Sequence, residues 1–354
     1  MLTSRAETIL KSIVGQYIAK AMPVPSQSIC NSYDLRVSPA TIRNEMARLE
    51  QEGYIIRPHP SSGSVPSDKG YRCYVESLNE VTLPLATQRL IGHLFHQVER
   101  EHEEWLGLAA TIMAQLAQNM AVATKPKSPD CRFKRLELVA LRDLLVLVVL
   151  ILQGARVKQQ LITLEPARPQ AGLTAMANKL NEAYSGLNSS QILAKDIELP
   201  PSEQQLTDCL VKMMQAEDEQ EFEETYLDGM HFTLHQPEFA RANRMLELME
   251  LVEHRSLLRA ILPQELSIHE LRVIIGKENK AEAVQHYSVV ISRYGLPEEA
   301  SGIIGVVGPT RMPYAHTIST VSYLSSVLSK LVAELHGREI PPGVTTNDSF
   351  DTLS

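Results

Sequence analysis

The first 78 residues contain three short helical patterns in a row, and this order restricts the folds that the chain can adopt. Ser4 and Glu7 have the spacing of a capping box at a helix start. Apolar residues then recur at helical intervals, and further helical patterns run from Ser28 to Tyr33 and from Ser38 to Gln51. The sequence therefore predicts a small N-terminal unit of three helices joined by turns.

The third of these helices has clear start and stop signals. Ser38 is a favoured N-cap, Pro39 suits the first helical position, and Gly53 supplies the stop. Three apolar residues at i, i+4 and i+7 point to one side of the helix: Ile42, Met46 and Leu49. The other side carries small residues, an amide and two guanidinium groups: Ala40, Thr41, Arg43, Asn44, Ala47, Arg48 and Gln51.

This polar side has the chemistry that a helix needs in the DNA major groove. Alanines let the backbone approach the base edges, Asn44 can pair with adenine, and an arginine can pair with guanine or hold a phosphate. With the turn from Asp34 to Val37 before it, the helix completes a helix-turn-helix arrangement. A strand at Tyr54–Ile56, a turn at Ser61–Gly63 and a second short strand near 64–66 then predict a wing.

Charge separates this unit from the rest of the chain. Residues 1–78 carry nine basic and seven acidic side chains, which leaves 25 basic and 35 acidic ones for the remainder. A solvated helix face is the alternative interpretation of the polar side. Three helices, a turn and a hairpin on a net-positive segment favour DNA binding instead.

Composition excludes several other classes of protein. A formal net charge of -8 argues against a protein that coats nucleic acid without regard to sequence. The longest apolar run, Leu144 to Leu152, is far shorter than the roughly 20 residues that span a bilayer. The start of the chain lacks the apolar core of a secretory signal. The four cysteines form no Cys-x-x-Cys pair, so we expect a cytoplasmic protein without a disulfide scaffold.

The larger part of the chain alternates between strand and helix patterns. A long helix is expected from Leu85 to Val122, and a final helix from Tyr314 to Leu335. Strand-like stretches occur in two groups: 135–141, 144–152 and 156–164, then 271–275, 288–294 and 302–307. If all of them form one antiparallel sheet, the largely helical residues between the groups must be an insertion.

Signals of an enzyme or a metal site are weak. Gly302, Gly305 and Gly308 do not have the spacing of a dinucleotide-binding loop. His231 and His235 could share a metal at i, i+4, but no third and fourth ligand is evident. No nucleophile constellation can be assembled, so we expect no catalytic residue, cofactor or metal. Arg311, after Gly-Pro-Thr at a helix start, could meet an anion or brace a domain interface.

Three motifs carry a resemblance to a known family. They are Val37-Ser38-Pro39-Ala40-Thr41-Ile42-Arg43-Asn44-Glu45-Met46, the stretch Pro58-His59-Pro60-Ser61-Ser62-Gly63 with Val65-Pro66-Ser67-Asp68-Lys69-Gly70-Tyr71-Arg72, and Gly305-Val306-Val307-Gly308-Pro309-Thr310-Arg311-Met312-Pro313-Tyr314. Ile275-Gly276-Lys277-Glu278-Asn279 and Ser288-Val289-Val290 agree with them. The chain resembles the heat-inducible transcription repressors called HrcA from about Leu2 to Leu335.

The resemblance implies a winged-helix domain and a GAF-like domain with an inserted dimerisation domain. It further implies a homodimer that binds an inverted-repeat operator upstream of chaperone genes, blocks transcription, and depends on a GroEL-type chaperonin. This chain departs from the family pattern in two places. Ser64 stands where a basic residue usually follows the wing glycine, with Lys69 and Arg72 as substitutes, and Pro60 stands where a hydroxyl residue is commoner.

The sequence thus predicts an α+β chain with an N-terminal winged helix-turn-helix domain, and the resemblance implies that the rest is a GAF-like domain with a largely helical insert. Its expected function is negative regulation of transcription of class I heat-shock operons, released by heat stress. A small-molecule-sensing transcription factor that uses the GAF-like domain is the alternative. The expected segments are 1–78 for DNA binding, 79–165 and 265–338 for the GAF-like domain, 166–264 for the insert, and 339–354 for a flexible tail. The expected DNA-binding residues are Ser38, Thr41, Arg43, Asn44, Arg48, His59, Ser62, Gly63, Ser64, Lys69 and Arg72.

Overall fold

The computed structural model describes residues 2–32, 38–59, 62–78, 81–98, 102–127, 131–153, 156–195, 199–219, 225–240, 242–253, 260–261, 266–296, 300–335 and 337. The expected turn at 34–37, the wing residues Pro60 and Ser61, and the tail at 339–354 lie outside these residues. The chain folds into two compact units, one made of residues 1–126 and 224–354 and the other of residues 127–223. Both mix helices with antiparallel sheet, so the fold class is α+β.

The first unit begins with three helices, as the helical patterns predict: α1 (Ser4–Lys20), α2 (Ser26–Ser32) and α3 (Pro39–Gln51). The start of α1 differs in detail, because Thr3 and not Ser4 is the N-cap and accepts a hydrogen bond from the N–H of Ala6 at 3.3 Å. A hairpin of β1 (Ile55–Ile56) and β2 (Val65–Pro66) follows, and then α4 (Asp68–Glu76).

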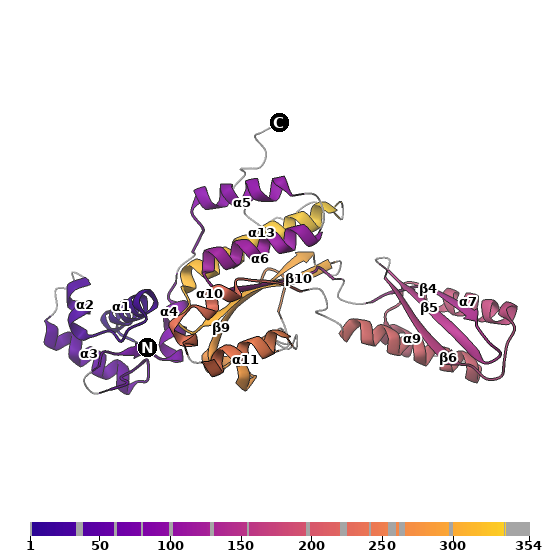
Figure 1. The fold of residues 1–354 in the computed structure, drawn as a ribbon, viewed down its shortest axis with the longest axis horizontal. Coiled ribbons are helices and arrows are strands. Elements are labelled where there is room, and N and C mark those ends of the chain that lie inside the picture. Colours follow the sequence, from indigo (N-terminus) through magenta and orange to yellow (C-terminus); the bar gives the residue numbers. More distant parts are fainter. Residues whose placement is uncertain are drawn as a thin grey trace. The chain divides into compact units, whose positions relative to one another are not determined.

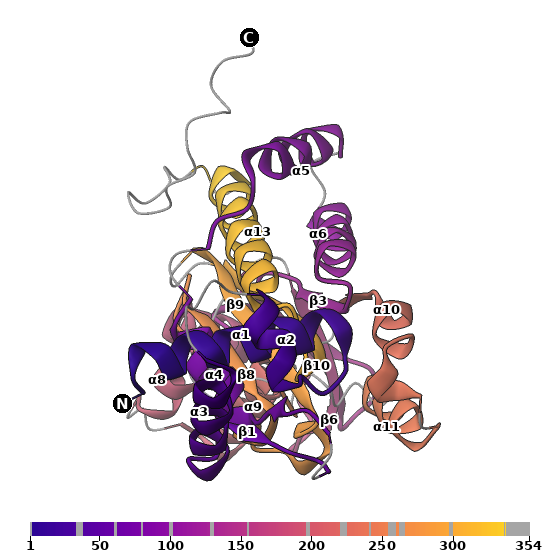
Figure 2. The same ribbon diagram turned by 90° about the vertical axis from the view of Figure 1, so that its left-hand side faces the viewer.

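The rest of the first unit is a five-stranded antiparallel sheet in the order β7-β3-β10-β9-β8. Its strands are β3 (Met120–Thr124), β7 (Thr225–Asp228), β8 (Leu271–Ile275), β9 (Tyr287–Leu296) and β10 (Ala300–Pro309). Helices α6 (His102–Ala117) and α13 (Tyr314–Leu335) pack side by side on one face of the sheet (Figures 1 and 2), and α5 (Leu85–Gln97) contacts α6. The shorter α10 (Met230–Leu234) contacts β3, and α11 (Ala242–Glu253) follows it in the chain.

The expected long helix from Leu85 to Val122 is wrong. Two helices, α5 and α6, occupy the segment, and its last residues enter β3. All five residues of β3 are buried, and Ala121 pairs with Val306 of β10 on one side and Asp228 of β7 on the other. A short apolar run of this kind has no periodicity of its own that separates a helix end from a central strand.

The second unit has a sheet of its own. Strands β4 (Phe133–Ala140), β5 (Leu145–Leu152) and β6 (Val157–Thr163) form it, and α7 (Gln170–Tyr184), α8 (Ser189–Leu193) and α9 (Pro201–Glu219) follow. The expectation of one shared sheet is therefore wrong, and the insert differs from the expected 166–264. Its three strands come from the segment assigned to the GAF-like domain, whereas α10 and α11 belong to the first unit.

The core of the second unit lies between one face of its sheet and the helices that follow. The residues of β5 alternate between buried and half-buried, so one side chain in two lies on the inner face of the sheet. That face packs on α7 and α9 in a core that includes Phe133, Leu150, Leu180 and Leu210. No helix in the described ranges is both long and apolar enough to cross a membrane.

Candidate nucleic-acid interface

Helix α3 is held at its start by a side-chain cap and along its length by buried apolar residues. The Ser38 Oγ accepts a hydrogen bond from the N–H of Thr41 at 3.2 Å, and Pro39 occupies the first turn. Ile42, Met46 and Leu49 are at most 3% exposed and lie in the core with α1 and α2. The opposite face of α3 is therefore turned to solvent.

The exposed face presents the predicted base-reading groups. Arg43 and Asn44 are exposed, and within the described ranges neither forms a hydrogen bond or an ion pair. Among the described residues, nothing therefore occupies their donors and acceptors. Thr41 is half-buried, and its hydroxyl lies 3.0 Å from that of Ser38, which places it at the helix start beside the cap.

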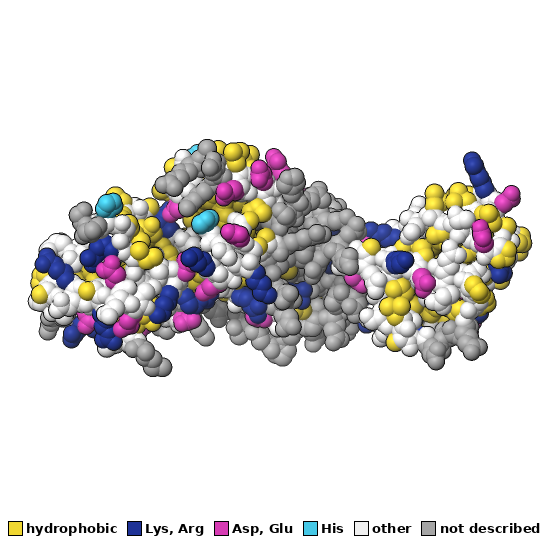
Figure 3. Space-filling model, turned by 90° about the horizontal axis from the view of Figure 1, so that it is seen from below, with side chains coloured by type: hydrophobic (Ala, Val, Ile, Leu, Met, Phe, Trp, Pro, Cys, Tyr) yellow, Lys and Arg dark blue, Asp and Glu magenta, His cyan; other side chains and the backbone are white. Residues whose placement is uncertain are grey.

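Arg48 is exposed but has a partner on its own helix. Its Nε donates to Oε1 of Glu52 at 2.7 Å, one turn further along the chain. A second ion pair joins Arg57 after β1 to Glu50 at 3.1 Å, so the hairpin is tied to α3. Basic and acidic side chains are accordingly mixed on the N-terminal part of the molecule in Figure 3, without one continuous basic patch. Glu52 is not among the expected site residues, although its i, i+4 spacing from Arg48 indicates the pair.

The hydroxyl group of Ser62 closes the hairpin turn. The Ser62 Oγ accepts a hydrogen bond from the N–H of His59 at 3.0 Å and donates to the carbonyl oxygen of the same residue at 2.8 Å. Gly63 lies against the backbone of Val24, where a Cβ would come within 2.4 Å of the Val24 carbonyl carbon. The ring of His59 is exposed, whereas Ser62 and Gly63 shape the turn.

Ser64 is not on the exposed face, which corrects the expectation that it contacts DNA. Only 1% of its surface is exposed, and its backbone forms two hydrogen bonds with Val24, at 2.8 and 2.9 Å. A long basic side chain at this position would have no room to remain buried. The loss of the usual basic residue thus coincides with a tight pairing of the hairpin to the segment after α1.

The two proposed substitutes for that basic residue have other partners. The Nζ of Lys69 donates to the carbonyl oxygen of Glu52 at 2.8 Å and lies 4.1 Å from the centre of the Tyr54 ring. The positive charge of Lys69 therefore interacts favourably with the free carbonyl groups at the C-terminal end of α3. Arg72 donates to both carboxylate oxygens of Glu278 and, at 2.7 Å, to the carbonyl oxygen of Val273. The hydrogen bond to Glu278 raises the pKa of Arg72. Its guanidinium is thus engaged within the protein, and its expected contact with DNA stays a prediction.

The larger part of the chain matches a known family. The model of the HrcA protein C-terminal domain matches residues 103–318, which is more than half of the chain. The chain belongs to the HrcA family of heat-inducible transcription repressors. The match covers the sheet of the first unit and the whole second unit, and it leaves the N-terminal helices to be compared with full-length relatives.

Full-length HrcA relatives cover those helices as well. A heat-inducible transcription repressor HrcA of Dehalococcoides mccartyi is 53% identical over 343 residues, which covers 97% of this chain and 99% of the relative. One from Chloroflexus aggregans is 38% identical over 359 residues, and covers 96% of each. A crystal structure of a hypothetical protein covers 94% of this chain and 99% of its own with a TM-score of 0.61. At 21% identity, that likeness shows the fold alone.

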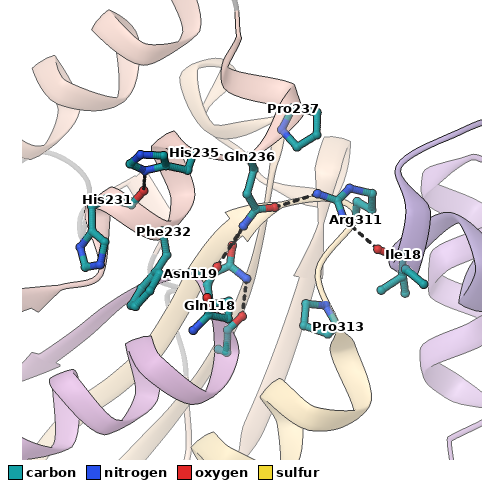
Figure 4. A pocket seen from close by; sticks show the side chains of 12 residues that line it. Ile18, Gln118, Asn119, His231, Phe232, His235, Gln236, Pro237, Arg311 and Pro313 are labelled. Atoms are coloured by element: carbon teal, nitrogen blue, oxygen red, sulfur yellow. Dashed lines mark hydrogen bonds between the residues drawn. The ribbon is translucent and has the colours of Figure 1, made fainter.

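Arg311 of the HrcA C-terminal motif contacts protein groups on three sides. It donates to the carbonyl oxygen of Ile18 at 2.7 Å, to Oε1 of Glu238 at 2.7 Å, and to the side-chain oxygen of Gln236 at 3.1 Å. Figure 4 shows Arg311 between Gln236 and the end of α1 that carries Ile18. Of the two roles left open by the sequence, these contacts correspond to the brace.

An open cavity of about 670 Å³ lies beside this arginine. Its walls include His231 and Phe232 of α10, His235 directly after that helix, and Gln118 and Asn119, which precede β3 (Figure 4). The Nδ1 of His235 lies 2.6 Å from the carbonyl oxygen of His231. In the part of the chain that the structure describes, no three histidine, cysteine or acidic side chains are grouped as metal ligands.

Proposed function

We propose that this chain represses transcription of heat-shock chaperone operons by binding an inverted-repeat operator as a homodimer. In this proposal residues 2–78 form a winged-helix domain with α3 as the recognition helix and the β1–β2 hairpin as the wing. The five-stranded sheet with α6 and α13 is the GAF-like domain, and residues 127–223 are its dimerisation insert. Because it acts on DNA, we place the protein in the cytoplasm.

The exposed face of α3 is the observation that carries this proposal. The helix is anchored by a buried apolar side, so its polar side is presented on a rigid support. On that side Arg43 and Asn44 have no protein partner in the described ranges, and both have the bidentate geometry that reads guanine and adenine. Arg48, Ser38, Thr41 and the hairpin residue His59 then serve as phosphate contacts that fix the register of the helix in the groove.

The homodimer is supported by an uncovered apolar face on the sheet of the insert. The side of β5 that does not face α7 and α9 carries four half-buried aliphatic residues: Leu145, Leu147, Val149 and Ile151. Neighbouring strands extend this face with Val139, Val157 and Leu161, which are 41%, 52% and 55% exposed. A strand that is apolar on both sides is typical of a sheet covered on both faces, so we propose that a second copy covers it.

A two-fold dimer presents two recognition helices and therefore requires an operator with two inverted half-sites. Repression then follows because the bound dimer occludes RNA polymerase. We propose that heating releases the DNA when the active dimer is lost and that a GroEL-type chaperonin restores it. Family membership supports these last two steps.

DNA-binding titrations with matched variants test the proposal. Duplexes that the wild-type chain selects from a random pool serve as the specific probe, and scrambled duplexes of equal length serve as the non-specific one. Asn44→Ala should weaken binding to the selected duplex by about 1–3 kcal/mol and relax the base preference at one position of each half-site. Binding to scrambled DNA should hardly change, because the residue carries no charge.

Arg89→Ala is the matched control, since it removes an exposed guanidinium from α5, far along the chain from α3. It should leave both affinities unchanged. Equal losses on selected and scrambled DNA for Asn44→Ala, or a selected duplex without an inverted repeat, would contradict the proposal.

A further inference from the structure

Helix α4 connects the N-terminal helices to the sheet of the first unit. It packs against α1 and β2 on one side and against β8 on the other. Asp68, in its first turn, accepts a hydrogen bond from the N–H of Lys277 at 3.0 Å. Arg72, one turn later, donates to Glu278 and to the carbonyl oxygen of Val273. Two consecutive turns of α4 are thus tied to the segment around β8.

The segment that receives α4 is shaped for this contact. Gly276 has a positive φ of 53°, and a Cβ there would lie 2.4 Å from a carboxylate oxygen of Asp68. The carboxylate of Glu278 also accepts a hydrogen bond from the N–H of Ile275 at 2.9 Å, which holds it in place for Arg72. The close approach of α4 therefore depends on a glycine and on an acceptor that is oriented in advance.

A buried aromatic contact continues the junction towards the C-terminal motif. The rings of Tyr71 on α4 and Tyr314 at the start of α13 lie 5.7 Å apart, and both side chains are at most 2% exposed. The hydroxyl of Tyr314 donates to the carbonyl oxygen of Thr310 at 2.8 Å. Three residues before Tyr314, Arg311 holds the carbonyl oxygen of Ile18 near the end of α1. A cation at that end of a helix interacts favourably with its free carbonyl groups.

Three motifs that are far apart in the sequence therefore meet at one place: residues 66–72, 275–279 and 308–314. The two helices that they hold, α1 and α4, pack on each other, and α1 packs on α3.

We propose that Arg72 and Arg311 are positioning residues, which fix the direction of α3 relative to the sheet domain and so set the half-site spacing that the dimer accepts. The inference rests on the proposed DNA-binding function. A dimer gains affinity from its second recognition helix only when both helices reach their half-sites together. A loosened junction lets each helix bind alone but removes the preference for one spacing.

The test compares single half-sites with complete operators of different spacing, using the full chain. Arg72→Ala and Arg311→Ala should each bind a duplex with one half-site within about twofold of the wild type. On the selected inverted repeat, the affinity of each variant should fall about tenfold or more. The reason is that the two recognition helices no longer reach both half-sites together. Duplexes with one to four base pairs added or removed between the half-sites should then differ less from one another than they do for the wild type.

Two further variants separate positioning from folding. Arg72→Lys keeps a donor for Glu278 and should recover part of the spacing preference. Arg89→Ala should match the wild type on every probe. The Arg72–Glu278 pair is partly exposed, with side chains 30% and 37% exposed, so its loss should leave the chain folded. The Arg311–Glu238 pair is more buried, at 14% and 23%, so circular dichroism and light scattering are measured for both variants to establish that they are folded and dimeric.

Parallel losses on the half-site and on the complete operator, or an unchanged spacing preference in Arg72→Ala and Arg311→Ala, would overturn the inference while leaving the proposed function in place. A wild-type chain that binds selected and scrambled duplexes equally would instead overturn the proposed function, and the inference with it.

Discussion

The N–H of Lys277 donates a hydrogen bond to the carboxylate of Asp68 at 3.0 Å, across 209 residues of sequence. The neighbouring Gly276 has no side chain to keep the two apart. Its positive φ disfavours any other residue, and a Cβ 2.4 Å from the carboxylate would push the Asp68 side chain away from the N–H of Lys277.

Gly276→Ala should therefore destabilise the first unit by about 1–3 kcal/mol, because it combines an unfavourable backbone conformation with a steric clash. Urea unfolding monitored by circular dichroism measures this change. Gly107→Ala is the control: Gly107 lies inside α6 with no atom within 4 Å of the added Cβ, so the change should be neutral or stabilising by up to about 1 kcal/mol. Similar stabilities for the two variants would contradict the argument.

Ser38 has two predicted roles, which different substitutions separate. Ser38→Ala removes the cap of α3 and should lower the free energy of unfolding by about 1 kcal/mol. Ser38→Asp keeps a capping oxygen, so stability should be retained, but its negative charge should repel DNA phosphates. Thermal unfolding and DNA titration of both variants measure the two effects. An aspartate variant that binds DNA as well as the wild type would exclude Ser38 from the interface.

The apolar face of the insert provides a test of the dimer. Leu161 on β6 is 55% exposed, and Leu161→Asp should shift the chain towards monomer because a charge would be buried in the interface. Gln160 directly precedes Leu161 and points to the other side of the sheet, so Gln160→Asp should leave the dimer intact. Sedimentation equilibrium measures both. Equal association of the two variants would show that another surface forms the dimer.

Cys131 should be almost inert in the folded chain. Burial raises its pKa to about 12, a hydrogen bond with Asp218 adds to the shift, and only 1% of the residue is exposed. At pH 8 it should hold about a thousandfold less thiolate than an unperturbed cysteine. Iodoacetamide labelling followed by peptide mass mapping should modify Cys131 only after unfolding in guanidinium.

The same pKa shift predicts how stability depends on pH. The unfolded chain loses the Cys131 proton near its ordinary pKa of about 8.5, whereas the folded chain retains it up to about 12. The contribution to stability is therefore complete below about pH 8.5 and declines as the pH rises above it. Rapid native labelling at Cys131, or a Cys131→Ala variant with an unchanged alkaline stability profile, would contradict this assignment.

Local signals in the sequence are sufficient to predict helix α3, but they do not predict which segments surround it. Ser38, Pro39 and the apolar positions of α3 act within one or two turns, so the sequence alone defines both the start of the helix and its exposed face. Strand pairing is different, because the run from Leu144 to Leu152 is compatible with either sheet. Its membership in the insert depends on partners that only the folded chain brings together.

The partners of single residues likewise depend on segments that only the folded chain brings together. Arg72 was predicted to contact DNA because it is basic and close to the wing, yet its acceptors are 201 and 206 residues away. Ser64 was assigned to the wing surface from its position after Gly63, but the pairing with Val24 buries it. Helix-level patterns describe which side of an element is exposed, whereas ion pairs between distant segments are set by tertiary packing.

Removing the negative charge of Glu52 should increase the affinity of the chain for DNA. The carboxylate of Glu52 binds Arg48 at 2.7 Å on the exposed side of α3, so it adds a negative charge at the interface and occupies a guanidinium that could hold a phosphate. Glu52→Gln should raise the affinity for DNA and make the logarithm of the association constant fall more steeply with salt, by up to about 0.9 for each additional phosphate contact. Glu7→Gln breaks a similar i, i+4 pair with Lys11 on α1 and controls for the change in net charge. Titrations at several salt concentrations would reject the role of Glu52 if both variants showed the same slope.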